Sequence, residues 1–326
     1  MPILAVLQGL VRVVDSPEPA PRRQYATGPV ADMKSPAKKR SGPVRVAVVL
    51  RPMDSIAEAL RANAGRPLSE RQHLYSPAAQ AYQRTRPRYP EHIVDAACAS
   101  AGLPERARVL EIGCGPATLT TRLAEMGFRV EAIEPNPDFS AMARAACARS
   151  RHVHIHNQAF EEWPLEAARF DAVIAATSLH WVPIEVALPK AAAALKPGGH
   201  LILFWNMSLQ LTPEMHEALG ELYAAHAPEL HRRETLPQQQ ASLAGIAREV
   251  ERSGRFLLCD SGAAVCLHSY PVDDYLQVLT SFSPYLALEA KVRESLLEGI
   301  RVRLLRDSGE KVALRHLSAF QVFKLA

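Results

Sequence analysis

Apolar residues recur in two patterns between residues 91 and 205. Short apolar runs alternate with longer segments whose apolar positions repeat at helical spacing. The run at 170–176 is almost wholly apolar, as expected for a strand covered on both faces. The alternation predicts an α/β fold with a Rossmann-like, doubly wound, mostly parallel sheet. Its predicted strands are 107–113, 130–134, 152–157, 170–176 and 200–205, and its predicted helices are 91–100, 118–126, 137–149 and 184–195.

The alternation stops after residue 205. Thr212-Pro213-Glu214 has the capping chemistry of a helix start, and a second helical stretch covers 237–252. Later strands at 256–267 and 312–324 flank helices at 272–281 and 285–305. We therefore expect a core at 69–205, an inserted helical cap at 206–255, and a segment at 256–326 that completes the sheet.

The first 68 residues differ in composition from the rest. They contain 11 Lys and Arg against 5 Asp and Glu, whereas residues 69–326 contain 27 against 29. This leader, residues 1–68, is rich in Pro, Ala and basic residues and is most basic at Lys38-Lys39-Arg40. We expect it to be disordered. Its start lacks the features of a secretory signal. A transit peptide and a working start at Met53 both remain open.

Composition excludes several other classes of protein. The chain has 326 residues, 48% hydrophobic and 22% charged, which is ordinary globular content. It has no apolar run long enough to span a bilayer, so we expect no membrane partner. Its 5 cysteines form no C-x-x-C pair, which favours a reducing cytoplasm. The slightly acidic body argues against a nucleic-acid partner.

A glycine turn joins the predicted strand at 107–113 to the helix that follows it. Gly113 and Gly115 allow a tight turn and a close approach of ligand to backbone. A dinucleotide fingerprint would place a small residue at Thr118, but here the small residue is Ala117. The turn predicts a nucleotide-type ligand at the carboxyl edge of the sheet, although a purely structural corner would look the same.

The stretch Glu111 to Ala117 resembles motif I of the class I S-adenosylmethionine-dependent methyltransferases. Further motifs of that family follow in order over about residues 70–205, and they resemble most a subgroup distantly similar to trans-aconitate methyltransferase. The resemblance also implies that the two late strands form an antiparallel edge. The supporting motifs are R-P-R-Y-P at 86–90, F-E-E-W-P at 160–164, L-H-W-V at 179–182 and L-K-P-G-G-H-L at 195–201.

The resemblance implies S-adenosylmethionine as cofactor and S-adenosylhomocysteine as product. Glu134 would bind the ribose hydroxyls, although it could instead be a charge at a helix start. Tyr82 would cover the methionine end and Arg86 would bind its carboxylate, with a packed aromatic and a structural arginine as the alternatives. Many relatives have aspartate at Ala159, so adenine would be read by backbone groups and Phe160. The remaining cofactor residues are Glu111, Gly113, Cys114, Gly115, Pro135 and Thr177.

The acceptor would lie where the predicted strand 170–176 ends, beside Ser178, His180 and Trp181. His180 is the candidate general base because an imidazole ordinarily titrates near neutral pH, although it could merely shape the wall. Methyl transfer needs no metal. The alternating His152, His154 and His156 have no carboxylate or cysteine partner evident in the sequence, so we expect no metal site.

The resemblance therefore predicts an enzyme that transfers a methyl group from S-adenosylmethionine to a small molecule. The alternatives are an RNA or protein methyltransferase, a non-catalytic binder of the cofactor, and an NAD-dependent oxidoreductase. The acceptor and the oligomeric state do not follow from the sequence.

Overall fold

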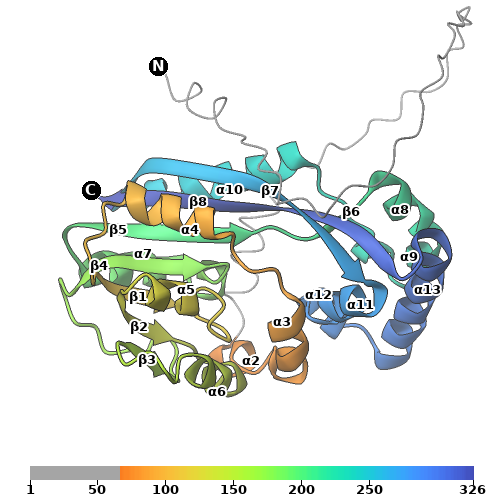
Figure 1. Ribbon diagram of the computed structural model, residues 1–326, viewed down its shortest axis with the longest axis horizontal. Helices are drawn as coiled ribbons and strands as arrows, with labels where there is room; N and C mark the ends of the chain where they lie inside the picture. Colours follow the sequence, from red (N-terminus) through yellow and green to blue (C-terminus); the bar gives the residue numbers. More distant parts are fainter. Residues whose placement is uncertain (1–66) are drawn as a thin grey trace, which may run out of the picture.

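The computed structural model describes residues 67–326 (Figure 1). The expectations for Met53 and for the leader up to residue 66 lie outside this part of the chain. The leader was expected to extend to residue 68, but the short helix α2 (Leu68–Arg71) already begins there.

The sheet has the predicted doubly wound topology. Its spatial order is β3-β2-β1-β4-β5-β8-β6. Strands β5 and β6 pair with different parts of one edge of β8, and β7 pairs with its opposite edge. The first five strands are parallel, and β8 runs antiparallel to β5, β6 and β7, which confirms the antiparallel edge. The strands are β1 (Arg108–Ile112), β2 (Arg129–Ile133), β3 (Val153–His156), β4 (Phe170–Ala176), β5 (Leu195–Asn206), β6 (Gln210–Leu211), β7 (Phe256–Pro271) and β8 (Lys311–Leu325).

Helices cover both faces of the sheet (Figure 1). One face packs against α4 (Glu91–Ser100), α5 (Thr120–Glu125) and α6 (Pro137–Ala146). The other packs against α7 (Ile184–Ala194) and α10 (Leu236–Arg252). Because both faces are covered, β4 is apolar along almost its whole length, as its sequence predicts.

The expected helical cap divides into two parts. Helix α10 buries Leu243, Ile246 and Val250 in the core of the sheet, so it is a layer of the fold rather than a cap. The elements α8 (Pro213–Ala218), α9 (Gly220–His226) and η3 (Pro228–Leu230) instead lie with the C-terminal helices. Those are α11 (Val272–Thr280), α12 (Ser283–Leu286) and α13 (Ala290–Ser308), which enclose a separate apolar cluster beyond the strand ends (Figure 1).

Residues 196–199, in the L-K-P-G-G-H-L motif, lie inside β5 as an irregularity in its pairing with β4. Leu195 pairs with Phe170 and His200 pairs with Ala172, so the intervening residues of β5 bulge out of register. Of the two glycines in this stretch, only Gly198 has a positive φ, 78°.

The segment after α2 crosses the carboxyl ends of the parallel strands. It contains η1 (Ser76–Ala78) and α3 (Ala79–Thr85), and α3 packs against α11. The hydroxyl of Tyr270 donates to the carbonyl of Thr85 at 2.8 Å. The N-terminal segment and the C-terminal helices thus close over the same edge of the sheet. Over residues 67–326, no helix is both long and apolar enough to cross a membrane.

Candidate functional site

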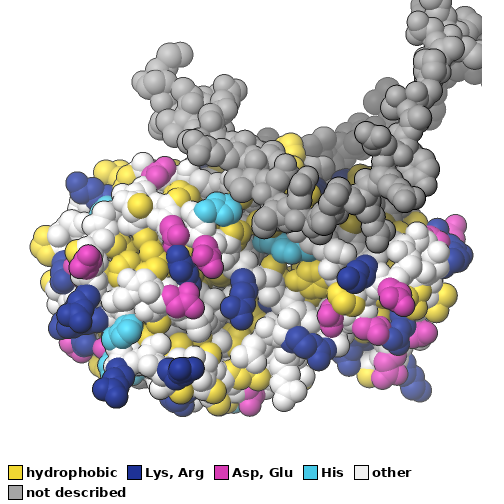
Figure 2. All heavy atoms as spheres, in the orientation of Figure 1, with side chains coloured by type: hydrophobic (Ala, Val, Ile, Leu, Met, Phe, Trp, Pro, Cys, Tyr) yellow, Lys and Arg dark blue, Asp and Glu magenta, His cyan; other side chains and the backbone are white. Residues whose placement is uncertain are grey.

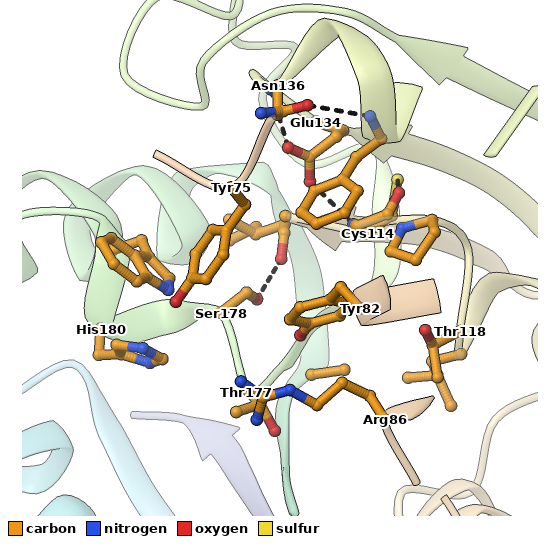
Figure 3. Close-up of a pocket in the computed structure, with 18 of the residues that line it drawn as sticks. Tyr75, Tyr82, Arg86, Cys114, Thr118, Glu134, Asn136, Thr177, Ser178 and His180 are labelled. Carbon is orange, nitrogen blue, oxygen red and sulfur yellow. Dashed lines mark hydrogen bonds between the residues drawn. The ribbon is translucent and has the colours of Figure 1, made fainter. Parts of the chain in front are cut away.

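A cavity of about 330 Å³ lies where the chain order of the sheet reverses, between β1 and β4. Ligands of doubly wound sheets bind at this position. The turn after β1, the ends of β2 and β4, and the segment 68–89 form its walls (Figure 3). Ala159 is buried and does not line it. The predicted residues that do are Tyr82, Arg86, Glu111, Gly113, Cys114, Gly115, Glu134, Pro135, Phe160, Thr177, Ser178, His180 and Trp181.

The two glycines of the turn are required for different reasons. Both have positive φ, 66° at Gly113 and 56° at Gly115. A Cβ on Gly113 would lie 2.8 Å from the Cβ of Ser178, whereas a Cβ on Gly115 would meet no atom within 4 Å. Gly113 therefore lets the turn pack against the end of β4, and Gly115 lets the backbone turn beside open space. The N–H groups of Gly113 and Cys114 both donate to the carbonyl of Ile133.

Glu134 directly follows β2 and closes the turn. Its carboxylate accepts from the N–H groups of Gly115 and Asn136, both at 2.8 Å. Burial raises its pKa to about 7, against the lowering effect of these two hydrogen bonds. Helix α6 is capped by Asn136, whose Oδ1 accepts from Phe139 N at 3.0 Å, so Glu134 is not the side chain that caps the helix. Each carboxylate oxygen keeps a second lone pair for a ligand.

The hydroxyls at the end of β4 are engaged with protein groups. Thr177 has φ 51°, an unusual conformation for a residue with a side chain. Its Oγ1 lies 2.6 Å from the hydroxyl of Tyr89 and accepts from Asn206 N at 3.1 Å. Ser178 donates to the carbonyl of Ile112. These bonds hold the end of the strand in place. On this wall, His180 and Trp181 are therefore the side chains that can contact a ligand.

His180 lies between two tryptophan rings, 5.2 Å from Trp181 and 6.0 Å from Trp205 between centroids. Its Nδ1 is buried and has no hydrogen-bond partner among the described residues. Burial lowers its pKa to about 4. This differs from the expected titration near neutral pH, because the sequence does not show how dry the site is. At pH 7 the ring is neutral and can accept a hydrogen bond.

Four aromatic side chains pack over the cavity beside Arg86. Between ring centroids, Tyr75 lies 5.5 Å from Trp181 and 5.7 Å from Tyr82. The ring centroid of Tyr82 lies 5.1 Å from that of Phe139. Tyr75 and Phe139 were not predicted as site residues. Tyr75 begins the stretch Y-S-P-A-A-Q-A-Y at 75–82, which also contains Tyr82. This shared stretch is the sequence feature from which Tyr75 could have been predicted as a site residue.

Arg86 is held in place but not neutralised. Its Nε and Nη2 donate to Oγ and the carbonyl of Ser281, both at 2.9 Å. Its guanidinium lies 3.9 Å from the ring centre of Phe282 and 4.9 Å from that of Tyr82. Among the described residues no carboxylate pairs with it, and its Nη1 has no hydrogen-bond partner. Arg86 is thus structurally anchored and still able to bind an anion.

The histidines of the third strand lie away from the cavity. Nε2 of His156 lies 2.6 Å from Oε2 of Glu131, a carboxylate partner that was not evident in the sequence. Glu131 lies on the neighbouring strand β2, a contact that spacing along one strand does not show. Within the described part of the chain, no group of three His, Cys, Asp or Glu could hold a metal ion.

Comparison with known proteins connects this site to methyltransferases. Residues 109–199 match a family model described as a methyltransferase domain. An uncharacterized methyltransferase of Mycobacterium tuberculosis (strain ATCC 25618 / H37Rv) is 37% identical over 164 residues, which cover 50% of this chain and 64% of the relative. A malonyl-[acyl-carrier protein] O-methyltransferase of Enterobacter lignolyticus (strain SCF1) is 29% identical over 175 residues, 51% of this chain and 68% of that protein.

The matched part is less than two thirds of the length of the M. tuberculosis relative. The solved structure of a proposed type II methyltransferase from Anaeromyxobacter dehalogenans has a TM-score of 0.53 and 21% identity, covering 73% of this chain and 97% of that one. Its likeness confirms the Rossmann-like class I fold. Together these findings show that the chain is similar to methyltransferases and has their class I fold. None of the proteins named here is a trans-aconitate methyltransferase, so that narrower kinship stays a prediction.

Proposed function

We propose that this protein transfers a methyl group from S-adenosylmethionine to a small molecule. The observation that carries the proposal is the closed turn at the sheet's switch point, where the Glu134 carboxylate holds Gly115 N and still has free lone pairs. A carboxylate in this place can accept both vicinal hydroxyls of a ribose.

The donor set fits the rest of the cofactor. Nη1 of Arg86 can donate to the methionine carboxylate. The faces of Tyr75 and Tyr82 can stabilise a sulfonium cation. Glu111 is fully buried beneath the turn and can carry a negative charge there when a cation binds. The carboxylate and the sulfonium of S-adenosylmethionine thus each have a complementary group in or beside this cavity.

The same turn argues against an NAD-dependent oxidoreductase. A dinucleotide places its pyrophosphate on free backbone N–H groups of such a turn. Here Gly113 and Cys114 donate to Ile133, and Gly115 donates to Glu134. No N–H of these three residues is left for a phosphate, and the carboxylates of Glu111 and Glu134 would repel it.

The bound cofactor would supply a methyl group on a good leaving group, so the protein's main work is positioning and exclusion of water. The aromatic cover and the apolar Met207, Leu209 and Phe282 would enclose the acceptor. His180 would accept a hydrogen bond from the acceptor's O–H or N–H and, if a proton must leave, take it.

The size and charge of the site favour a small acceptor over a macromolecule. Segment 68–89 forms one wall of the cavity, which leaves little room for a folded partner. On the visible face, Lys and Arg are interspersed with Asp and Glu rather than gathered into a basic patch (Figure 2). RNA would need such a patch to neutralise its phosphates.

The proposal is tested with S-adenosylmethionine labelled in its methyl group. The full chain is incubated with metabolite, RNA and protein fractions of a cell extract, beside Glu134→Ala as the control. We expect label only in the metabolite fraction, and less of it with the variant. Label in RNA or protein would refute the small-molecule acceptor, and no transfer into any fraction would favour a non-catalytic binder.

A further inference from the structure

Glu111 is a buried carboxylate on the central part of the sheet. Strand β1 pairs with β2 on one side and β4 on the other, which places Glu111 opposite Ala132 and Ile174. The side chain has no solvent exposure, and neither carboxylate oxygen has a hydrogen-bond partner among the described residues. A buried group of this kind is costly unless something compensates its charge.

The groups around Glu111 supply no positive charge. Thr120 on α5 lies near enough for its hydroxyl to lower the pKa of Glu111, but the two form no hydrogen bond of normal geometry. Glu134 at the end of β2 raises that pKa, and Tyr89, Cys114 and Cys147 are acids that Glu111 itself affects. Within residues 67–326, Glu111 forms no ion pair.

This environment favours a proton on the ligand-free protein. Burial, more than the neighbouring Glu134, raises the pKa of Glu111 to about 7. The pKa of Glu134 is raised to about 7 as well, again by burial. Near neutral pH the two carboxyls therefore hold about one proton between them, and a nearby cation would favour its release.

We propose that Glu111 is the counter-charge of the cofactor, and that S-adenosylmethionine expels a proton from it on binding. This inference rests on the proposed function. S-adenosylmethionine carries one net positive charge at neutral pH, and S-adenosylhomocysteine, a neutral sulfide, carries none. Glu111 thus favours the substrate form of the cofactor over its product, and the charge that holds the cofactor disappears once the methyl group has moved.

The direction of the pH dependence follows from the charge that binds. The ionised form of Glu111 attracts the cation, so affinity for S-adenosylmethionine should rise with pH up to about 7 and then level off. One coupled proton gives at most about a tenfold change per pH unit. S-adenosylhomocysteine lacks the sulfonium, so its affinity should change less over the same range.

The experiment is isothermal titration of the full chain with each ligand, in buffers of different ionisation enthalpy at pH 7. These buffers give the number of protons released as well as the affinity. For the wild type we expect more protons released by S-adenosylmethionine than by S-adenosylhomocysteine. Glu111→Gln should remove this difference and lower the affinity ratio of the two ligands by about tenfold.

Glu134→Gln is the matched control, because both ligands carry the same ribose. It should weaken both about equally and leave their affinity ratio unchanged. If both ligands bind wild type with equal proton release, the inference fails and the proposed function stands. An unchanged affinity ratio in Glu111→Gln would also overturn the inference. If neither ligand binds wild type, both fail. The wild-type proton count needs no variant, so misfolding of Glu111→Gln would not remove the test.

Discussion

The two halves of the cavity differ in how their polar groups are satisfied. At the ends of β1 and β2, the N–H groups of Gly113, Cys114 and Gly115 are paired, and Glu134 accepts two hydrogen bonds. On the opposite wall, Nδ1 of His180 and Oδ1 of Asn206 are buried without partners in the described part of the chain. The turn and Glu134 are thus preformed for a cofactor, with only the carboxylate of Glu111 left unbonded beneath them. On the opposite wall the unpaired groups can be satisfied by a ligand, which is what a site for a specific acceptor requires.

The largest expected effect separates the two glycines of the preformed half. Gly113→Ala should cost roughly 2–4 kcal/mol of unfolding free energy, because positive φ is combined with overlap on Ser178. Gly115→Ala has nearly the same φ and no overlap, so about 1–2 kcal/mol is expected. Urea unfolding measures both, and equal costs would mean that contact with Ser178 does not constrain the turn.

Glu134→Ala should weaken S-adenosylmethionine binding by about tenfold or more, since it removes the ribose acceptor and leaves the N–H groups of Gly115 and Asn136 unpaired. Titration calorimetry measures the affinity, and thermal unfolding shows whether the variant folds. Wild-type affinity in a folded variant would rule out the ribose assignment.

His180→Ala tests the half with unpaired groups. Turnover of an acceptor found in the labelled extract should fall by about tenfold or more, while affinity for S-adenosylmethionine stays within about twofold. Because the pKa of His180 is about 4, its protonation should not reduce the wild-type rate until the pH approaches that value. If the variant has the wild-type rate, His180 only lines the cavity and takes no part in methyl transfer.

The last effect, which is spread over several pH units, is on the stability of the ligand-free protein. The pKa of Glu111 is about 7 in the folded state and near 4.5 when unfolded, so the folded state binds more protons between these values. Unfolding free energy should therefore fall as pH rises from about 4.5 to 7, by at most about 1.4 kcal/mol per pH unit from this group. Urea unfolding at several pH values should show a shallower fall for Glu111→Gln. Equal slopes would mean that Glu111 does not titrate there.

The same contrast explains how much the sequence could predict. The turn, Glu134 and the strands are local features, so their spacing and apolar pattern were enough to place them. Contacts between distant elements could not be predicted in this way. His156 on β3 contacts Glu131 on the neighbouring strand β2, and the burial of His180 depends on Trp205 from β5. Helix α10 was predicted as a helix, but whether it covers the sheet or caps the site depends on tertiary packing.

The central claim is that this cavity holds S-adenosylmethionine on Glu134. Its most direct test is calorimetric titration of the wild-type chain with S-adenosylmethionine and, separately, with NAD. We expect one molecule of S-adenosylmethionine to bind per chain and no binding of NAD, because the N–H groups of Gly113, Cys114 and Gly115 are already bonded and two carboxylates lie beside them. Binding of NAD without binding of S-adenosylmethionine would contradict the account.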